Sequence, residues 1–557
     1  TGGKNIIIST IFKFSFILDE IGSSLKDKRF AIIIDEAHSS QSGKAASAVS
    51  TALSGNAGEK KKYVQMAVQE DEYHALAAED VVDGVEAEED TEDKIVSIIK
   101  GRKMAKNANY YAFTATPKNK TLEMFGTKVV DAEGAVQHLP FHEYTMKQAI
   151  EEEFILDVLR YYTPYTSYYK VQKAIEDDPE FDKKKSQSKI RAYVERQPET
   201  IEQKARIMVD HFCKKVYMKI GGKARAMVVT SSIECAIEFY KVISRLLEER
   251  GNKYKAIVAF TDKEIDGKVV TESSLNGFPS SDIEAKVAED PYRILIVADK
   301  FQTGYDQPLL HTMYVDKQLS DLKAVQTLSR LNRCYPGKKD TFVLDFANDP
   351  DMIRESFQKY YKTTILEGES DVNKLNDLIE SIEAYNFYTD DDVEKAIGFY
   401  LSGKNEDRSK LDAVLDAVAE RFKNELTVED DRVKCKSAIK NYTRIYPFLA
   451  SIMPFESEEW EKKFIFYSKL LPKLPKLKID DFTEGLLETI DFDKYRIVKE
   501  QERAIELEDT DTSVSPIPVG QGGGKKEAEM DLLSNIVQTF NDTFGNIEWK
   551  NKDEVQR

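Results

Sequence analysis

Two adjacent carboxylates follow an apolar run near the start of the sequence. Residues 30–34 read Phe-Ala-Ile-Ile-Ile, which is typical of a buried strand, and Asp35, Glu36 and His38 follow it in the order Asp-Glu-Ala-His. Hydrolysis of a nucleoside triphosphate needs a carboxylate that holds Mg²⁺ and another group that orients or deprotonates the attacking water. Asp35 suits the metal role and Glu36 suits the water role. An acidic pair alone would indicate a solvated turn, but the whole tetrad after an apolar strand favours nucleotide hydrolysis.

A second polar group follows another apolar strand. Thr114 and Thr116 come directly after the apolar residues 110–113, in the string Thr-Ala-Thr-Pro. Small hydroxyl side chains at such a position can bond to the acidic site and relay its state. Alone, the string could be a simple exit from a strand. It becomes informative because the acidic tetrad precedes it.

A third polar group lies much later in the chain, in a loop that joins two apolar runs. Thr303, Gly304 and Asp306 belong to the string Gln-Thr-Gly-Tyr-Asp, which follows a strand predicted to end near Ala298. Gly304 permits a tight backbone turn. Thr303 is placed to contact a phosphate or a partner lobe.

Two arginines and a glutamine follow at helical spacing. Gln326, Arg330 and Arg333 lie at i, i+4 and i+7, which predicts one face of a helix. Arginines on one face can reach across a cleft and neutralise the charge that develops on a γ-phosphate. The alternative, for an isolated pair, is an ordinary helix with salt bridges.

The elements that must position these residues alternate between apolar strands and helices, which predicts an α/β fold with parallel sheets. We expect the C-terminal part of a first lobe at 1–144, interrupted by an acidic insert at about 60–105 that reads as solvated or disordered rather than as a DNA mimic or docking tail. A tyrosine-rich helical connector is expected at 145–188, where packing is favoured over base stacking. A second lobe at 189–350 and a helical C-terminal domain at 351–557 complete the prediction.

Composition is that of an ordinary soluble globular protein. The residues are 41% hydrophobic and 32% charged. A chain of 557 residues is too long for a single hydrophobic core. No apolar run reaches the roughly 18 residues of a membrane span. The net charge of −18 excludes a protein covered in nucleic acid but not one with a basic track. The four cysteines show no metal-binding spacing. So few cysteines in a chain of this length do not predict a disulfide framework, and the cytoplasm is the expected compartment.

The order of these motifs over two α/β lobes resembles superfamily 2 helicases and translocases, whose lobes are RecA-like. The residues that make up these motifs are most similar to those of the R (motor) subunits of type I restriction enzymes. The resemblance covers roughly Ile6 to Phe346. Four stretches carry it: Asp35 to Gly43, Ala112 to Pro117, Ile294 to Asp316, and Gln326 to Cys334.

The resemblance implies a cytoplasmic, DEAH-box hydrolase that uses ATP and Mg²⁺ to translocate duplex DNA. It also implies partner modification (methyltransferase) and specificity subunits, and cleavage by an upstream nuclease domain. Asp35 would hold the metal, Glu36 the water, and Arg330 and Arg333 would be arginine fingers. The resemblance implies further nucleotide contacts at His38, Thr114, Thr116, Gly304, Asp306 and Gln326. It implies DNA contacts at Ser9, Thr10, Thr230, Ser231 and Thr303.

The sequence departs from this family at the phosphate loop. No G-x-x-x-x-G-K-[ST] string precedes Asp35, and neither does a nuclease motif. We therefore expect a first lobe that is incomplete here, and a fragment that hydrolyses ATP weakly or not at all. Two other functions stay open: an unwinding helicase for DNA or RNA, and a binding module for nucleic acid or subunits that has no turnover.

Overall fold

The structure is a computed structural model. It describes residues 6, 8, 29–35, 108–130, 134–251, 253–265, 268–302, 304–367, 374–402, 404–452, 457–475, 483, 485–515 and 529–545. Several positions singled out above lie outside the described residues, namely Ser9, Thr10, Glu36, His38, Thr303 and the whole acidic insert at 60–105.

The chain divides into two compact units whose boundaries differ from the predicted ones. The first unit comprises residues 1–142, 364–479 and 513–526, and the second comprises 143–363, 480–512 and 527–557. The predicted connector and the predicted second lobe therefore form a single unit. The predicted C-terminal domain is divided between the two units, because its helices and its later strands pack in different cores.

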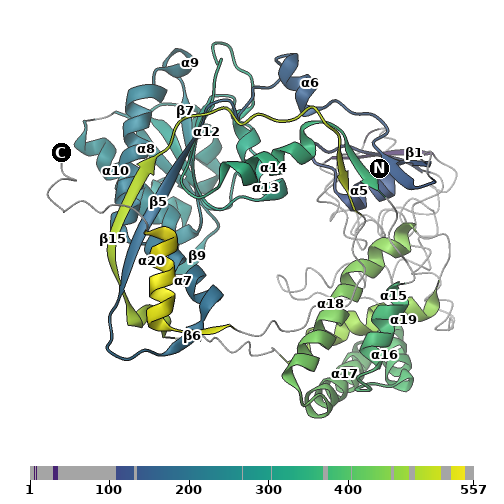
Figure 1. The fold of residues 1–557 in the computed structure, drawn as a ribbon. Helices are drawn as coiled ribbons and strands as arrows, with labels where there is room; N and C mark the ends of the chain where they lie inside the picture. The colour runs from purple at the N-terminus through teal and green to yellow at the C-terminus, as the bar shows by residue number, and fades with distance from the viewer. Residues whose placement is uncertain are drawn as a thin grey trace. The chain divides into compact units, whose positions relative to one another are not determined.

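A seven-stranded sheet is the centre of the second unit (Figure 1). Its strand order is β15-β5-β13-β12-β7-β11-β8, and every neighbouring pair is parallel except β15 with β5. The strands are β5 (Tyr162–Lys173), β7 (Arg225–Thr230), β8 (Lys255–Ala259), β11 (Tyr292–Val297), β12 (Leu310–Asp316), β13 (Phe342–Asp345) and β15 (Ile490–Lys499). The mixed α/β class with a mostly parallel sheet agrees with the prediction.

Both faces of this sheet are covered by helices, as the continuous apolar strands require. Along β7, Ala226 and Val228 pack on one side, and Met227 and Val229 pack on the other, because successive strand side chains alternate between faces. One face is covered by α8 (Pro198–His211) and α10 (Ile233–Glu249). The other face is covered by α12 (Ile283–Ala288), α13 (Asp321–Leu328) and α14 (Pro350–Tyr361).

The second unit also contains smaller elements. These are α6 (Met146–Glu151), β6 (Glu180–Asp182), α7 (Lys183–Glu195), a π-helix (Phe212–Val216), α9 (Lys219–Gly222), β9 (Lys263–Ile265), β10 (Lys268–Val270), α11 (Glu272–Asn276), three 3₁₀ turns (Ser280–Asp282, Ser329–Leu331 and Leu486–Thr489), β17 (Met530–Leu532) and α20 (Leu533–Phe544).

The prediction of a helical connector at 145–188 is wrong over most of its length. Its tyrosines lie in or next to β5, a twelve-residue strand between β13 and β15. The repeated Tyr and Thr residues favour an extended strand, which explains the outcome. Tyr162 donates a hydrogen bond to Asp345 at 2.6 Å, and Tyr165 stacks on Phe346 with ring centroids 4.8 Å apart. These rings therefore pack in the protein, as favoured above.

The C-terminal region is not uniformly helical either. Strand β15 joins the edge of the sheet beside β5, and α20 packs through Leu533, Ile536 and Phe540 on a core that includes Tyr169. Periodicity alone could not reveal β15, because its partner strand lies more than 300 residues earlier in the chain.

The first unit contains the strand that ends at the acidic motif. Strand β1 (Phe30–Ile34) pairs in parallel with β2 (Ala108–Ala112). The prediction that β1 is buried is wrong in the described residues, where its side chains are alternately half-buried and exposed and Ile33 is 71% exposed. Burial on both faces needs a covering layer on each side. Among the described elements, helix α5 (Asn119–Phe125) contacts β2 of this pair.

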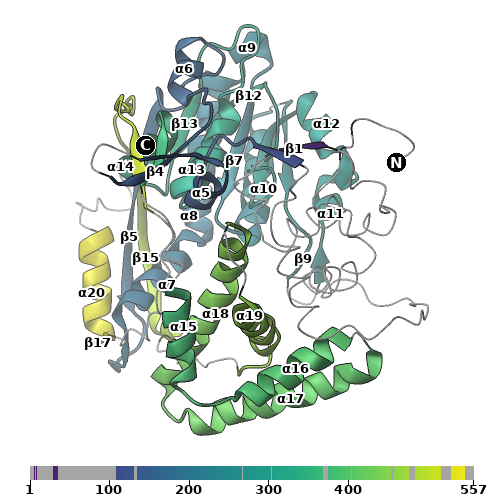
Figure 2. The same ribbon diagram turned by 90° about the vertical axis from the view of Figure 1, so that its right-hand side faces the viewer.

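A second sheet and a helical bundle complete the first unit. The sheet order is β16-β14-β4-β3, from β3 (Thr127–Val130), β4 (Val136–Leu139), β14 (Thr364–Glu367) and β16 (Thr512–Val514), and α5 (Asn119–Phe125) lies beside it. The bundle has its own apolar core. Its helices (Figure 2) are α15 (Lys374–Glu383), α16 (Asp390–Ser402), α17 (Asn405–Glu425), α18 (Glu429–Ile452) and α19 (Glu458–Leu470).

A buried ion pair in the second unit leads to a stability prediction. Nζ of Lys204 on α8 lies 2.6 Å from Oδ1 of Asp316 at the end of β12, and their side chains are 0% and 7% exposed. Burial opposes the charge on Lys204, but Asp316 keeps the pKa of this lysine above its usual value. Lys204→Met should lower the unfolding free energy of this unit by about 3–5 kcal/mol, because it leaves a buried carboxylate uncompensated.

Urea unfolding of the variant and the parent tests this expectation. Lys241→Met, which removes an exposed ion pair with Glu238 on α10 of the same unit, is the matched control and should leave the transition unchanged. A Lys204→Met transition that matches the control would show that the pair contributes nothing.

Candidate functional site

The first unit brings Asp35 and Thr114 to one edge of its parallel pair. The two strands are in register, with Ile34 opposite Ala112, and the amide of Phe113 donates to the carbonyl of Ile34 at 2.8 Å. Asp35 follows β1 directly, and Thr114 follows β2 after Phe113, so both strands continue from the same carboxyl edge. This is the edge at which ligands bind in open α/β sheets.

The Thr-Ala-Thr-Pro string forms a tight turn. The amide of Thr116 donates to Oγ1 of Thr114 at 3.1 Å, which is a local side-chain to backbone bond of the kind that threonine favours in turns. The side chain of Thr116 is buried, whereas Asp35 is exposed. Oγ1 of Thr114 therefore stabilises the turn, and the side chain of Thr116 is buried in it.

The Asp35 carboxylate at this edge is a ligand of the kind that a nucleotide-bound Mg²⁺ takes. No group of three or more His, Cys, Asp or Glu side chains among the described residues could hold a metal ion. Mg²⁺ in phosphoryl-transfer sites usually takes one or two carboxylates and completes its shell with phosphate oxygens and water. One exposed carboxylate at a strand end, Asp35, meets that requirement. Glu36 and His38 lie outside the described residues.

The second unit contains the Gln-Thr-Gly-Tyr-Asp loop between β11 and β12. Gly304 has φ = +71° and Phe301 has φ = +65°, both in the left-handed region that glycine adopts without strain. Nε2 of Gln302 donates to the carbonyl of Ala298, and the rings of Phe301 and Tyr305 lie 4.8 Å apart. The loop is therefore packed against itself, and it turns sharply at Gly304.

Residues 330–333, the arginine segment, are bonded directly to this loop. Nε of Arg333 lies 3.0 Å from Oδ1 of Asp306, and Nη1 of Arg330 donates to the carbonyl of Tyr305 at 3.0 Å. Nε of Arg330 also donates to the carbonyl of Gln326 at 3.0 Å. The structure thus joins Asp306, Gln326, Arg330 and Arg333, which are separated in sequence, into one site.

The prediction that Gln326, Arg330 and Arg333 share one helical face is wrong for Arg333. Helix α13 ends at Leu328, a 3₁₀ turn covers 329–331, and Arg333 forms an antiparallel bridge with Ile155. A 3₁₀ turn has 3.0 residues per turn, so the α-helical spacing no longer applies after it. Arg333 leaves the helix and reaches Asp306 from an extended backbone.

The two predicted DNA-contact residues that the structure describes differ in exposure. Thr230 ends β7, is fully buried, and its hydroxyl lies 3.0 Å from the carbonyl of Ser232 and 3.1 Å from that of Val297. Its side chain holds neighbouring strand ends together. Ser231 is exposed at the carboxyl edge of the sheet, so it is the residue of this pair that a ligand can reach. Arg330 and Arg333 instead lie near the start of β12.

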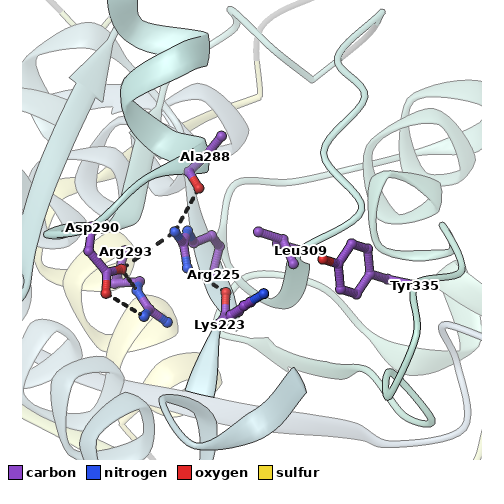
Figure 3. A pocket seen from close by; sticks show the side chains of 7 residues that line it. All are labelled: Lys223, Arg225, Ala288, Asp290, Arg293, Leu309 and Tyr335. Carbon is purple, nitrogen blue, oxygen red and sulfur yellow. Dashed lines mark hydrogen bonds and ion pairs between the residues drawn. The ribbon is translucent and has the colours of Figure 1, made fainter. Parts of the chain in front are cut away.

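Sequence reasoning missed a polar pocket at the amino-terminal edge of the same sheet. It has a volume of about 360 Å³ (Figure 3), and its lining residues are Lys223, Arg225, Ala288, Asp290, Arg293, Leu309 and Tyr335. Arg225 donates to the carbonyls of Val287, Lys223 and Ala288, and Arg293 pairs with Asp290.

These bonds fasten the starts of β7 and β11. Burial, followed by the nearby Arg293, lowers the pKa of Arg225 to about 10. The signal in the sequence was an arginine at the start of each of two otherwise apolar strands. None of the predicted site residues lines this pocket.

Gly304→Ala should destabilise the second unit by about 1–2 kcal/mol, because a side chain in the left-handed region carries that cost. A Cβ at Gly304 would meet no atom within 4 Å, so the effect isolates backbone conformation from steric overlap. Gly398→Ala, inside α16 and equally free of contacts, is the control and should stabilise by about 0.5–1 kcal/mol. Thermal unfolding measures both variants, and equal shifts would contradict the left-handed turn.

A family model covers the segment that carries the second-unit site. Residues 267–348 match the model described as type I restriction enzyme subunit R domain 3. This range contains the Gly304 loop, Arg330 and Arg333. Over this segment the chain is similar to type I restriction enzyme R subunits.

Curated relatives agree with this family. The protein assigned as the type I restriction enzyme MjaIXP endonuclease subunit of Methanocaldococcus jannaschii is 27% identical over 46% of this chain and 25% of its own length. The MjaVIIIP endonuclease subunit of the same organism is 22% identical over 71% of this chain and 42% of its own length. The HindI endonuclease subunit of Haemophilus influenzae is 25% identical over 28% and 15%. The alignments thus span less than half of each of these R-subunit relatives.

A solved fragment of an assigned HsdR subunit of a type I restriction enzyme from Vibrio vulnificus YJ016 aligns over 46% of this chain and 44% of that one, at 15% identity and a TM-score of 0.27.

The four cysteines all lie within the described residues, and none of them forms a disulfide there. Among the described residues, no helix has both the length and the apolar character needed to cross a membrane.

Proposed function

We propose that this chain is the motor part of a type I restriction-modification enzyme, a RecA-like translocase that couples ATP hydrolysis to movement along duplex DNA. Cleavage would belong to an endonuclease domain outside the described residues. The partners would be duplex DNA and the modification and specificity subunits. The observation that carries the proposal is the joining of Arg333 and Arg330 to the Asp306 loop within the segment that matches the R-subunit model.

The proposed chemistry assigns one task to each group. ATP bound with Mg²⁺ would supply the phosphoryl group that is transferred to water. Asp35 would hold the metal, and Glu36, the next residue, would orient the attacking water. Arg333 would neutralise charge that develops on the γ-phosphate, whereas Arg330, whose guanidinium donates to two backbone carbonyls, would hold the loop. Thr114 would relay the state of the site through the turn at 114–116.

The test is ATP hydrolysis by the native polypeptide that carries this sequence, with duplex DNA, single-stranded DNA and RNA compared as stimulants. Stimulation by duplex DNA without strand separation supports a translocase. Stimulation by single strands or RNA, with strand separation, would instead indicate an unwinding helicase.

The 557-residue chain by itself is measured in parallel. Because it has no G-x-x-x-x-G-K-[ST] string before Asp35, we expect weak or no turnover from it. Salt-dependent DNA binding without turnover, in both the chain and the native polypeptide, would replace the proposal with a binding module.

A further inference from the structure

Lys338 is a buried lysine whose ammonium group is bonded to three backbone carbonyls. Its Nζ donates to the carbonyls of Leu331 at 2.7 Å, Arg333 at 2.9 Å and Pro308 at 3.2 Å, and the residue is 6% exposed. An ammonium has three N–H donors and no acceptor, so these three carbonyls account for its whole donor capacity. Among the described residues, no carboxylate forms an ion pair with it.

A buried charge without a counter-ion is costly, and hydrogen bonds to the charged group offset part of that cost. Here the three carbonyls come from two segments. Leu331 and Arg333 belong to the arginine segment, and Pro308 lies two residues after Asp306 in the loop. One ammonium group therefore fastens the backbone on both sides of the Arg333–Asp306 ion pair.

A second set of bonds holds the same arginine segment. The amide of Leu156 donates to the carbonyl of Asn332 at 2.8 Å, and Ile155 forms an antiparallel bridge with Arg333. Together with the Lys338 bonds, this means that the carbonyls of residues 331, 332 and 333 each accept a hydrogen bond. A guanidinium that must neutralise a developing charge needs such a fixed backbone, because a small misplacement costs much of its effect.

We propose that Lys338 is a positioning residue that fixes Arg333 against the loop containing Asp306 by joining the two backbone segments through its ammonium group. The positioning stands on the contacts above. Only its consequence for catalysis rests on the proposed function.

The protonation state of Lys338 sets the conditions for a test. Burial lowers the pKa of Lys338 to about 7. The neutral amine has two N–H donors instead of three, so it would leave one carbonyl unbonded. Measurements are therefore made at about pH 6, where the ammonium form predominates.

Hydrogen exchange of the 557-residue chain tests the positioning directly. Lys338→Met keeps the length of the side chain and removes every donor. We expect the amides of Leu156 and Asn332 to exchange about 10-fold faster or more, since charge-assisted bonds to their segment are lost, while amides of β7 and β11 stay protected. Lys339→Met, the exposed neighbour, is the matched control and should exchange as the parent does.

Unchanged exchange at Leu156 and Asn332 would overturn the proposal, and so would faster exchange throughout the sheet, which would mean that Lys338 only supports the core. If Lys338→Met does not fold, Lys338→Gln is measured in the same way. It keeps two N–H donors and should give intermediate protection, so parent-like protection in this variant would also overturn the proposal.

Turnover by the native polypeptide adds a second readout. Lys338→Met should lower kcat for ATP about 10-fold or more, with KM changed by less than about 3-fold, since an arginine that acts in the transition state affects kcat. A rise in KM at constant kcat would show that Lys338 does not affect catalysis through Arg333. If the parent hydrolyses no ATP, the proposed function fails, and the exchange experiment still decides whether Lys338 positions this segment.

Discussion

Arg333→Ala is expected to lower ATP turnover by about 10³–10⁵-fold while DNA affinity changes little, which is the size of effect that a removed arginine finger produces. Arg333 is the better candidate of the two arginines for structural reasons. Its side chain is 38% exposed and its described carboxylate partner, Asp306, is 67% exposed, so a nucleotide can compete for the guanidinium. Steady-state hydrolysis and DNA binding by the native polypeptide measure the two quantities.

Asp306→Asn is the matched control, because it weakens the same ion pair without removing the guanidinium. We expect this variant to keep most of the turnover. Equal losses in the two variants would mean that the Arg333–Asp306 pair itself, rather than a free guanidinium, is required. Collapse of DNA binding in Arg333→Ala would make Arg333 a phosphate clamp.

Glu36→Gln is expected to lower turnover by about 10²–10⁴-fold and to leave nucleotide binding intact, as the loss of a general base does. The reason is the position of Glu36 directly after Asp35. The chain leaves β1 at the carboxyl edge of the β1–β2 pair. The residue after the metal-binding carboxylate is the one proposed to orient water. Hydrolysis and equilibrium binding of a fluorescent ATP analogue measure the two effects.

Asp35→Asn is the companion variant, and it separates the two acids. It should raise the Mg²⁺ concentration needed for half-maximal hydrolysis, because a carboxylate ligand is lost. Glu36→Gln should leave that requirement unchanged. Equal turnover in Glu36→Gln and the parent would remove Glu36 from the mechanism.

The strands that position the site follow from local pattern. The apolar runs at β7, β11, β12 and β13 are strands of one mostly parallel sheet, and their continuous burial agrees with their composition. The carboxyl end of β7 carries Thr230 and Ser231, and in a parallel sheet the carboxyl ends of the strands meet at one edge. Asp35 and Thr114 lie likewise beyond the carboxyl ends of the parallel strands β1 and β2.

Other features were beyond local pattern. Arg333 lies at helical spacing from Gln326, yet α13 ends five residues earlier. Its carbonyl instead accepts a hydrogen bond from Lys338, and its backbone forms a β-bridge with Ile155, which lies almost 180 residues away. The tyrosines of β5 were assigned to a helix because the neighbours that make a strand favourable, β13 and β15, come from distant parts of the chain.

The sequence by itself determined the α/β class, the order of the motifs, and the chemistry available from Asp35, Glu36, Arg330 and Arg333. Each of these depends on residue type and on periodicity over a few residues. Only the tertiary structure decided that Arg333 pairs with Asp306, that Thr230 is buried, and that Lys338 holds the arginine segment. Those outcomes depend on hydrogen bonds and burial between residues far apart in the chain, and the strength of such contacts is set by the environment that the fold creates.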